Sequence, residues 1–234
     1  MPQAEQSELS ILTTYHDLDV LDVPEMVPPI RKALKEGRYE RREIAAGLQL
    51  FKPGDRIIEM GAGIGVVGAV IAKHTRPAAI LAVEPNYRLI DRITDLYRQN
   101  GLSHLLEVQQ TLIRSEPDAP NAMEFLVRIN FLGSGITIQR GHDRAERISV
   151  PVTHWSEIVA RFKPNAIMMD IEGAELDFFR HADLSGVDRV VLETHRGIYG
   201  REGMQEIRGC LSAQGLARTD LSGGGVFAWE RTSP

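Results

Sequence analysis

The stretch of sequence that decides the fold reads Glu-Met-Gly-Ala-Gly-Ile-Gly at residues 59–65. It joins a short run that predicts a strand, Arg56–Met60, to a segment with a helical pattern, Val66–His74. Glycines at this place allow the backbone to turn sharply and to approach a ligand closely. The N-terminus of the following helix offers free N–H groups, so we interpret the turn as a ligand-binding site at the end of a first strand.

Short apolar runs alternate with amphipathic segments along the rest of the chain. Further strands are expected at Ile80–Glu84, Leu105–Val108, Ala166–Asp170, Val187–Glu193, Leu216–Thr219 and Val226–Trp229. Helices are expected at Tyr87–Asn100, Ala174–Arg180 and Met204–Gln214. Strands separated by helices form a parallel sheet buried on both faces, whereas the last two strands lie too close in sequence for a crossover helix and should pair antiparallel. The sequence therefore predicts an α/β fold with a doubly wound, mostly parallel, Rossmann-like sheet.

Two parts of the chain have weaker patterns. Residues 1–38 are interpreted as an N-terminal extension that precedes one domain at residues 39–234. Residues 114–152 form a long irregular stretch with candidate strands at Glu124–Ile129 and Gly135–Gln139. Segments of this length often cover or shape a binding site. Substrate choice is therefore expected to lie in residues 1–38 and 114–152.

The composition limits the classes of partner. The chain has 234 residues, of which 43% are hydrophobic and 25% charged, as in a folded soluble domain. Its net charge of −5 disfavours general nucleic-acid binding, which needs an excess of Lys and Arg. The single cysteine, Cys210, excludes an internal disulfide, and the chain has neither a membrane-length apolar run nor a signal-peptide pattern. We expect a cytoplasmic protein without nucleic-acid or membrane partners; its oligomeric state, a homo-oligomer included, stays open.

A carboxylate beside the glycine turn bears on the identity of the ligand. Glu59 would repel a pyrophosphate and would suit a cation. S-adenosylmethionine (SAM) carries a sulfonium and an ammonium and no phosphate, so we favour it. The competing interpretation is a nicotinamide dinucleotide, because Gly63–Gly68 spells G-x-G-x-x-G, although its first glycine lies late relative to the strand. Glu84, at the end of the second strand, would bind the ribose hydroxyls of either cofactor.

A second group of ionisable side chains follows the fourth and fifth expected strands. Asp170 ends one strand, and Glu193 and His195 lie on one side of the end of the next. Because ligands of open α/β sheets bind beyond the carboxyl ends of the strands, the three should face one crevice. Either His195 is a general base that a carboxylate orients, or Asp170 and Glu193 hold a divalent metal that acidifies an acceptor hydroxyl. The alternative without chemistry is a helix cap at Asp170 and a surface histidine.

Several pieces of sequence occur in a definite order around the glycine turn. They are Tyr39-Glu40, Leu50–Asp55, Ile57–Gly65, Val83–Asn86, Val150–Thr153, Met169–Glu175 and Leu192–His195. Together they resemble an FkbM-type SAM-dependent methyltransferase, and the Asp-x-Glu-Gly-Ala-Glu piece that starts at Asp170 is the most specific to that family. The chain departs from the usual family pattern at Glu59 (aspartate), Gly63 (asparagine) and Met168 (lysine).

The resemblance implies a seven-stranded sheet with a final antiparallel hairpin, SAM as the methyl donor, and hydroxyl acceptors on sugars or natural products. The residues that it implies for the cofactor are Glu40, Glu59, Gly61, Ala62, Gly63, Gly65, Glu84, Gln110 and Thr111. Among these, Glu84 would bind the ribose, and Gln110 and Thr111 would flank the adenine. Asp170, Glu193 and His195 would face the acceptor. We therefore expect O-methyl transfer to a small-molecule or glycan acceptor; the alternatives are an NAD-type oxidoreductase and a SAM-binding module without catalysis.

Overall fold

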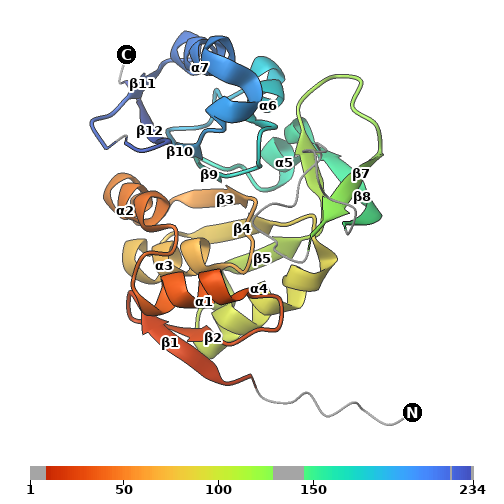
Figure 1. Ribbon diagram of the computed structural model, residues 1–234. Coiled ribbons are helices and arrows are strands. Elements are labelled where there is room, and N and C mark those ends of the chain that lie inside the picture. Colours follow the sequence, from red (N-terminus) through yellow and green to blue (C-terminus); the bar gives the residue numbers. More distant parts are fainter. Residues whose placement is uncertain (1–8, 129–144, 222, 233–234) are drawn as a thin grey trace.

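The computed structural model describes residues 9–128, 145–221 and 223–232. In this part of the chain, a seven-stranded sheet with the order β11-β12-β10-β9-β3-β4-β5 lies at the centre (Figure 1). Its strands are β3 (Arg56–Met60), β4 (Ala79–Val83), β5 (Leu106–Gln109), β9 (Ala166–Met169), β10 (Arg189–Glu193), β11 (Leu216–Arg218) and β12 (Val226–Arg231). The expected α/β fold is confirmed, and the bounds of each expected strand differ by two residues or fewer.

The direction of strand pairing follows from the connections. The strands β5, β4, β3, β9 and β10 pair parallel. The final hairpin is antiparallel, as expected, with β12 between β11 and β10. Met60 at the end of β3 lies beside Val83 of β4 and Met169 of β9, so these three strands reach the same edge of the sheet. The residues that follow them are thereby brought together.

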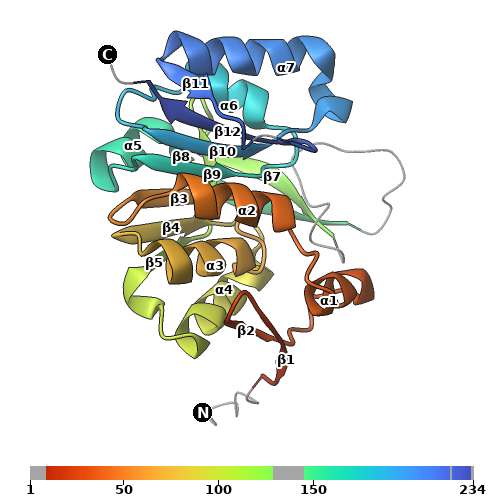
Figure 2. The ribbon, with the colours of Figure 1, turned by 90° about the vertical axis from the view of Figure 1, so that its left-hand side faces the viewer.

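Helices cover both faces of the sheet (Figure 2). They are α2 (Arg41–Leu50), α3 (Val66–Thr75) and α4 (Tyr87–Gln99) on one face, and α5 (Trp155–Arg161), α6 (Glu175–His181) and α7 (Arg196–Ala213) on the other. Successive residues of one strand enter different cores: Ile57 packs with the first group of helices and Ile58 with the second. This explains why the strands are apolar at nearly every position rather than at every second one.

The N-terminal segment contains a hairpin that its weak pattern did not predict, whereas the helix after it follows from an apolar stripe at Ile30, Ala33 and Leu34. An antiparallel hairpin of β1 (Ile11–Tyr15) and β2 (Leu18–Leu21) precedes α1 (Pro28–Lys35). The hairpin contacts α3 and α4, and its buried side chains belong to the same hydrophobic core as those of α2. The hydroxyl of Tyr15 also donates a 2.7 Å hydrogen bond to the carbonyl of Tyr39. Residues 9–35 therefore pack directly on the sheet domain.

A smaller sheet lies between β5 and β9 in the sequence. It contains β6 (Leu112–Arg114), β8 (Glu146–His154) and β7 (Ala122–Val127) in that order. The candidate strand at residues 124–129 corresponds to β7, which begins two residues earlier. The candidate strand at residues 135–139 lies outside the described residues. β8 was not predicted, since about half of its side chains are exposed and its apolar residues do not form a continuous run.

Helix α7 begins eight residues before the expected start at Met204. Its course is interrupted at Gly200, where φ is 67° and ψ is −167°. These angles are open to glycine but not to most residues. The glycines of this segment conceal its helical pattern, and only the part after the interruption was predicted.

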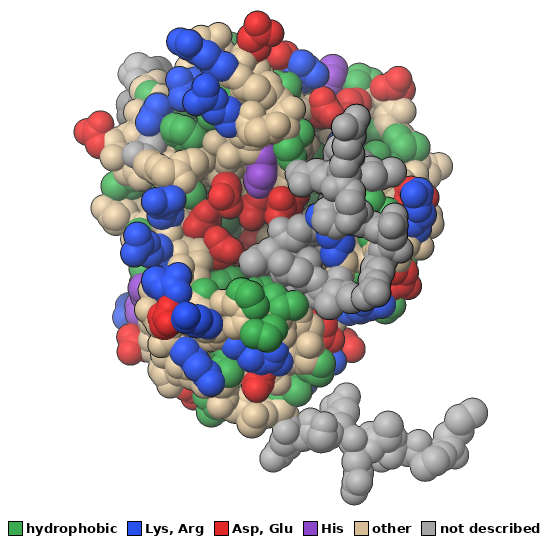
Figure 3. Space-filling view, viewed as in Figure 1, with side chains coloured by type: hydrophobic (Ala, Val, Ile, Leu, Met, Phe, Trp, Pro, Cys, Tyr) green, Lys and Arg blue, Asp and Glu red, His purple; other side chains and the backbone are tan. Residues whose placement is uncertain are grey.

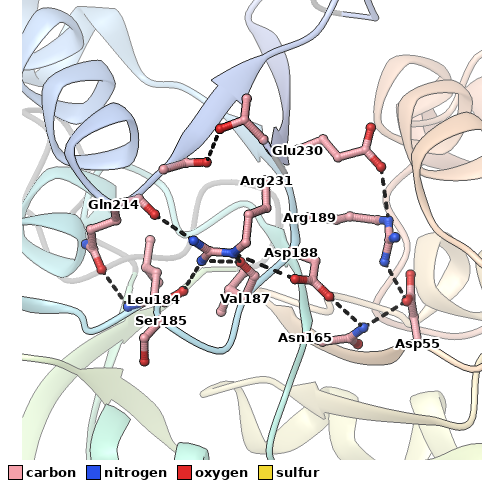
Figure 4. A network of polar contacts seen from close by, with 12 residues as sticks. Asp55, Asn165, Leu184, Ser185, Val187, Asp188, Arg189, Gln214, Glu230 and Arg231 are labelled. Atoms are coloured by element: carbon pink, nitrogen blue, oxygen red, sulfur yellow. Dashed lines mark hydrogen bonds and ion pairs between the residues drawn. The ribbon is translucent and has the colours of Figure 1, made fainter. Parts of the chain in front are cut away.

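Polar contacts join the loops at the amino ends of the parallel strands (Figure 4). Arg189 Nη1 lies 2.8 Å from Asp55 Oδ1, and Asn165 Nδ2 donates to the same oxygen over 3.0 Å. Asn165 Oδ1 in turn accepts a 2.7 Å hydrogen bond from the amide of Arg56. The network ties β3, β9 and β10 together at the edge opposite the candidate site.

Among the helices of the described ranges, none is both long and apolar enough to span a bilayer.

Candidate active site

The glycine turn lies at the carboxyl end of β3, and its backbone requires glycine. Gly61, Gly63 and Gly65 have φ values of 84°, 56° and 79°. A Cβ atom on Gly61 would lie 1.8 Å from the carbonyl oxygen of Asp170, so no side chain fits between the two loops. The amides of Gly61 and Ala62 donate to the carbonyl of Val83 over 3.0 and 3.1 Å. The turn is thus packed between the ends of β4 and β9.

Glu84 links the second strand to this turn. Its Oε2 accepts a 2.8 Å hydrogen bond from the amide of Gly63, and its Oε1 accepts one of 2.8 Å from the amide of Asn86. The side chain is buried, and this burial raises the pKa of the carboxyl to about 7 although both hydrogen bonds lower it. Each oxygen retains a lone pair for a further donor, as the predicted contact with a ribose hydroxyl requires.

Glu59 lies beneath the turn, and its carboxylate is directed toward helix α3. Oε1 accepts a 2.8 Å hydrogen bond from the amide of Gly68, and a Cβ on that glycine would lie 2.1 Å from Oε2. The residue is 3% exposed, and burial raises its pKa to about 8. Its carboxylate is therefore engaged by the first turn of the helix. Direct contact with the methionine part of SAM stays a prediction.

One pocket contains most of the predicted cofactor residues. Those that line it are Glu40, Glu59, Gly61, Ala62, Gly63, Glu84 and Thr111. Asp170 also lines it, which joins the glycine turn to the second acidic group. Gly65 and Gln110 are not part of the lining. The side chain of Gln110 instead donates to the carbonyl of Pro85 over 3.4 Å. The lining also includes residues for which no cofactor contact was predicted, among them Tyr39 and Arg114.

His195 is surrounded by carboxylates from the Asp-x-Glu-Gly-Ala-Glu segment. Its Nδ1 lies 3.0 Å from Glu175 Oε1, and its Nε2 lies 3.6 Å from Asp170 Oδ1 and 3.5 Å from Glu172 Oε2. Burial alone would lower the pKa of the imidazole, but the hydrogen bond to Glu175 and the charges of Asp170 and Glu172 raise it to about 9. The surrounding carboxylates therefore favour the protonated form of His195 in the free protein.

Like Glu172, Asp170 lines the pocket. Burial raises the pKa of its carboxyl, and the charge of His195 partly offsets the effect, which leaves the pKa at about 6. Its Oδ1 is buried and makes no hydrogen bond within the part of the chain that the structure describes. Glu172 and Glu175 were quoted in the family motif without a role. Their approach to His195 could not be predicted, because it depends on how the loop after β9 folds toward β10.

Glu193 belongs to a neighbouring carboxylate group. It lies with Glu40 and Glu43 of the α2 region, with one oxygen of each within 4.8 Å of the others. Burial and the charges of Asp170 and Glu43 raise the pKa of Glu193 to about 8. Figure 3 shows acidic side chains gathered in a hollow of the surface, with a histidine beside them.

The predicted metal ligands do not form one compact site. Among the described residues, the groups that could coordinate an ion are Asp170 with Glu175 and His195, and Glu193 with Glu40 and Glu43. Asp170 and Glu193 therefore fall into different groups. In the first group, Glu175 and His195 Nδ1 already bond to each other and are not both free to bind an ion. The residues therefore fit the predicted pair of metal ligands poorly.

The family model for the methyltransferase FkbM domain matches residues 59–216. The chain belongs to the FkbM methyltransferase family. The match begins at Glu59 of the glycine turn and extends past the piece that ends at His195. Methyl transfer is thus the reaction class that the family supports, and SAM is the donor expected of such a family.

Solved structures with a related fold are distant in sequence. A protein of the NADB-Rossmann superfamily from Streptococcus agalactiae is 11% identical, with a TM-score of 0.47, over 81% of this chain and 67% of that one. A SAM-dependent O-methyltransferase from Thermotoga maritima is 15% identical, with a TM-score of 0.45, over 84% and 67%. TYW2 of M. jannaschii in complex with AdoMet is 14% identical, with a TM-score of 0.43, over 92% and 81%. No curated protein matches the chain.

Proposed function

We propose that this FkbM-family chain is a SAM-dependent methyltransferase that methylates a hydroxyl oxygen of a small molecule or glycan. The observation that carries the proposal is a pocket rich in carboxylates: the buried Glu59 and Glu84 around the glycine turn, and the partly exposed Asp170 opposite them. The hydrogen-bond partners of Glu59 and Glu84 are backbone amides rather than cations, and buried carboxylates of this kind favour a ligand that brings positive charge. SAM brings such charge and no phosphate.

The residues of the pocket fit the cofactor as follows. Glu84 would accept hydrogen bonds from the ribose, while the backbone from Gly61 to Gly63 would pass close to the methionine part. When bound, SAM supplies a methyl group that its sulfonium has already activated for displacement. The remaining task of the protein is to align an acceptor oxygen with that methyl group and to receive the proton of the hydroxyl.

Asp170 is the proposed proton acceptor. Its side chain lines the pocket and is 32% exposed, so its carboxylate can accept a hydrogen bond from an acceptor hydroxyl. As the new carbon–oxygen bond forms, the proton of the hydroxyl passes to Asp170. His195 lies 3.6 Å away and carries positive charge, which keeps Asp170 ionised before the reaction. This assignment replaces our initial interpretation of His195 as the general base, because a protonated imidazole has no free lone pair.

Two competing functions make different demands on the site. An NAD-type oxidoreductase must hold a diphosphate at the glycine turn, where Glu59 and Glu84 are both buried within hydrogen-bond distance of loop or helix amides. These buried carboxyls offer no positive charge to a diphosphate and would repel it once ionised. A SAM-binding module without catalysis would bind SAM but would have no use for the orphaned oxygen of Asp170.

Calorimetric titration with SAM, S-adenosylhomocysteine and NAD tests the choice of cofactor. We expect saturable binding of the first two and no heat with NAD. Binding of NAD without binding of SAM would contradict the proposal.

A panel of acceptors tests the reaction. The protein is incubated with SAM and with sugars, glycosides and phenols, beside amines and thiols as controls, and S-adenosylhomocysteine is measured. We expect S-adenosylhomocysteine to be released only with hydroxyl compounds. Mass spectrometry and NMR of the product should locate the methyl group on oxygen. Methylation confined to nitrogen or sulfur, or SAM binding without turnover on any member, would argue against hydroxyl transfer.

A further inference from the structure

Glu175 is a buried carboxylate that neither lines the pocket nor contacts solvent. It is the first residue of α6 and is 0% exposed. Its Oε1 lies 3.3 Å from the amide of Ile171 and 3.1 Å from that of Gly173, so the loop after β9 holds the carboxylate in place. The same oxygen lies 3.0 Å from His195 Nδ1. One atom thus connects the loop of Asp170 to the side chain of His195.

The first turn of α7 completes this connection from the other side. The hydroxyl of Tyr199 accepts a 2.6 Å hydrogen bond from the amide of His195, and Tyr199 also hydrogen-bonds the carboxylate of Glu175. Ile198 packs where a side chain on Gly173 would lie, since a Cβ there would be 2.4 Å from Ile198 Cδ1. Both the backbone and the ring of His195 are therefore held by groups outside the pocket.

The orientation of the ring follows from these contacts. An imidazole whose Nδ1 donates to a fixed carboxylate must direct its other nitrogen away from it. Here Nε2 is directed toward Asp170 and Glu172, at 3.6 and 3.5 Å. Rotation of the ring by half a turn would break the bond to Glu175 and would remove the N–H from Asp170. The geometry resembles a carboxylate that orients a catalytic histidine, in which the carboxylate acts without touching substrate.

We propose that Glu175 is a positioning residue for methyl transfer, which holds His195 so that its Nε2–H faces Asp170. This inference rests on the proposed function, because it assigns His195 to the support of Asp170. Tyr199 assists by fixing the backbone of His195 and by bonding the same carboxylate.

The test compares Glu175→Gln with the wild type. Glutamine keeps an acceptor oxygen for the amides of Ile171 and Gly173, so the loop is retained, but it removes the charge that binds His195. Charge-assisted hydrogen bonds are about twice as strong as neutral ones. We expect the turnover number to fall by about tenfold or more, with the Kd for SAM changed less than about twofold. The matched control is Glu206→Gln, an exposed carboxylate that pairs with Arg180 and lies outside the pocket.

A spectroscopic readout separates positioning from a purely structural role and needs no acceptor. In protein labelled with ¹⁵N-histidine, the ring signals of His195 are assigned by their loss in His195→Gln. We expect the Nδ1-bound proton to be slow to exchange in the wild type and in Glu206→Gln, and to shift and exchange faster in Glu175→Gln. Tyr199→Phe should show a smaller shift, and it serves as the second variant if Glu175→Gln does not fold.

The outcomes are distinct. Unchanged ring signals and unchanged turnover in Glu175→Gln would overturn the inference and leave Glu175 a loop-closing residue. A loss of SAM binding equal to the loss of turnover would likewise overturn it, because the effect would then lie in the pocket. Absence of SAM binding by the wild type would instead refute the proposed function, while the ring signals would still decide whether Glu175 orients His195.

Discussion

The amide of Gly63 donates a 2.8 Å hydrogen bond to Oε2 of Glu84. Together with the bonds from the amides of Gly61 and Ala62 to Val83, this contact joins the glycine turn after β3 to the end of β4. It places a buried carboxylate beside the backbone of the turn. The pairing of β3 with β4 brings the two residues to the same edge of the sheet. The electrostatic character of the candidate cofactor site is thus built from residues that lie 21 positions apart in the sequence.

Replacement of Glu84 by glutamine should weaken SAM binding. The variant keeps the shape of the side chain but removes its charge, and loss of a charged hydrogen-bond partner costs about 1.5–3 kcal/mol, or about 10-fold to 100-fold in Kd. Calorimetry measures the change. Glu157→Gln, at an exposed position of α5, is the matched control and should bind SAM like the wild type. Equal affinity of the wild type and Glu84→Gln would remove Glu84 from the cofactor site.

Replacement of Gly61 by alanine should disrupt both the turn and the site. Its Cβ would lie 1.8 Å from the carbonyl oxygen of Asp170, so one of two backbone segments must move. We expect a loss of stability of about 2–4 kcal/mol and a large loss of SAM affinity. Gly54→Ala is the matched control, because Gly54 also has positive φ but open space around its Cβ position, and should lose only about 1 kcal/mol. Urea denaturation measures the stability of both variants. Equal losses of stability in Gly61→Ala and Gly54→Ala would contradict the steric account.

Replacement of Asp170 by asparagine should separate binding from reaction. Asparagine fits the same space but cannot accept the proton of a hydroxyl, and general-base contributions are about 10²-fold to 10⁴-fold. We expect turnover to fall within that range, while SAM still binds. The control is Asp220→Asn, an exposed residue near the final hairpin. Turnover close to that of the wild type would exclude Asp170 as the base.

The free protein should become less stable as pH rises. Burial raises the pKa of Glu59 to about 8 and that of Glu84 to about 7, from 4.5 as the ordinary value. Between these limits the unfolded chain binds fewer protons than the folded one, so the free energy of unfolding falls as pH rises from about 4.5 to about 8. His195, with its pKa raised to about 9 from 6.5, acts in the same direction at higher pH. Urea denaturation at several pH values measures the slope, which should be smaller in Glu59→Gln.

The same carboxyls should couple SAM binding to proton release. A bound cation favours their ionised form, so binding should release protons near neutral pH and should tighten as pH rises through about 7 to 8. Calorimetric titration in two buffers of different ionisation enthalpy counts the protons. Uptake of protons, or no dependence on the buffer, would show that these groups do not face the cofactor's charge.

The sequence by itself determined the sheet and the place of the cofactor turn. Apolar runs of strand length, separated by amphipathic segments, can be buried only in a sheet covered on both faces. Three closely spaced glycines after the first strand indicate a backbone with positive φ, which most other residues disfavour. These are local properties, and Gly61, Glu84 and Asp170 could therefore be placed at strand ends before the structure was considered. The N-terminal hairpin and β8 were missed, because their side chains alternate only weakly between buried and exposed.

The chemistry of the acceptor side was decided by tertiary structure alone. Whether His195 is a base or a bound cation depends on how many carboxylates surround it, and the three that do so come from one loop folded against the end of another strand. Their distances, and the burial that removes water from between them, set the protonation of His195 and Asp170. No spacing within the sequence encodes those quantities, because electrostatic interactions depend on separation in space and on the surrounding dielectric.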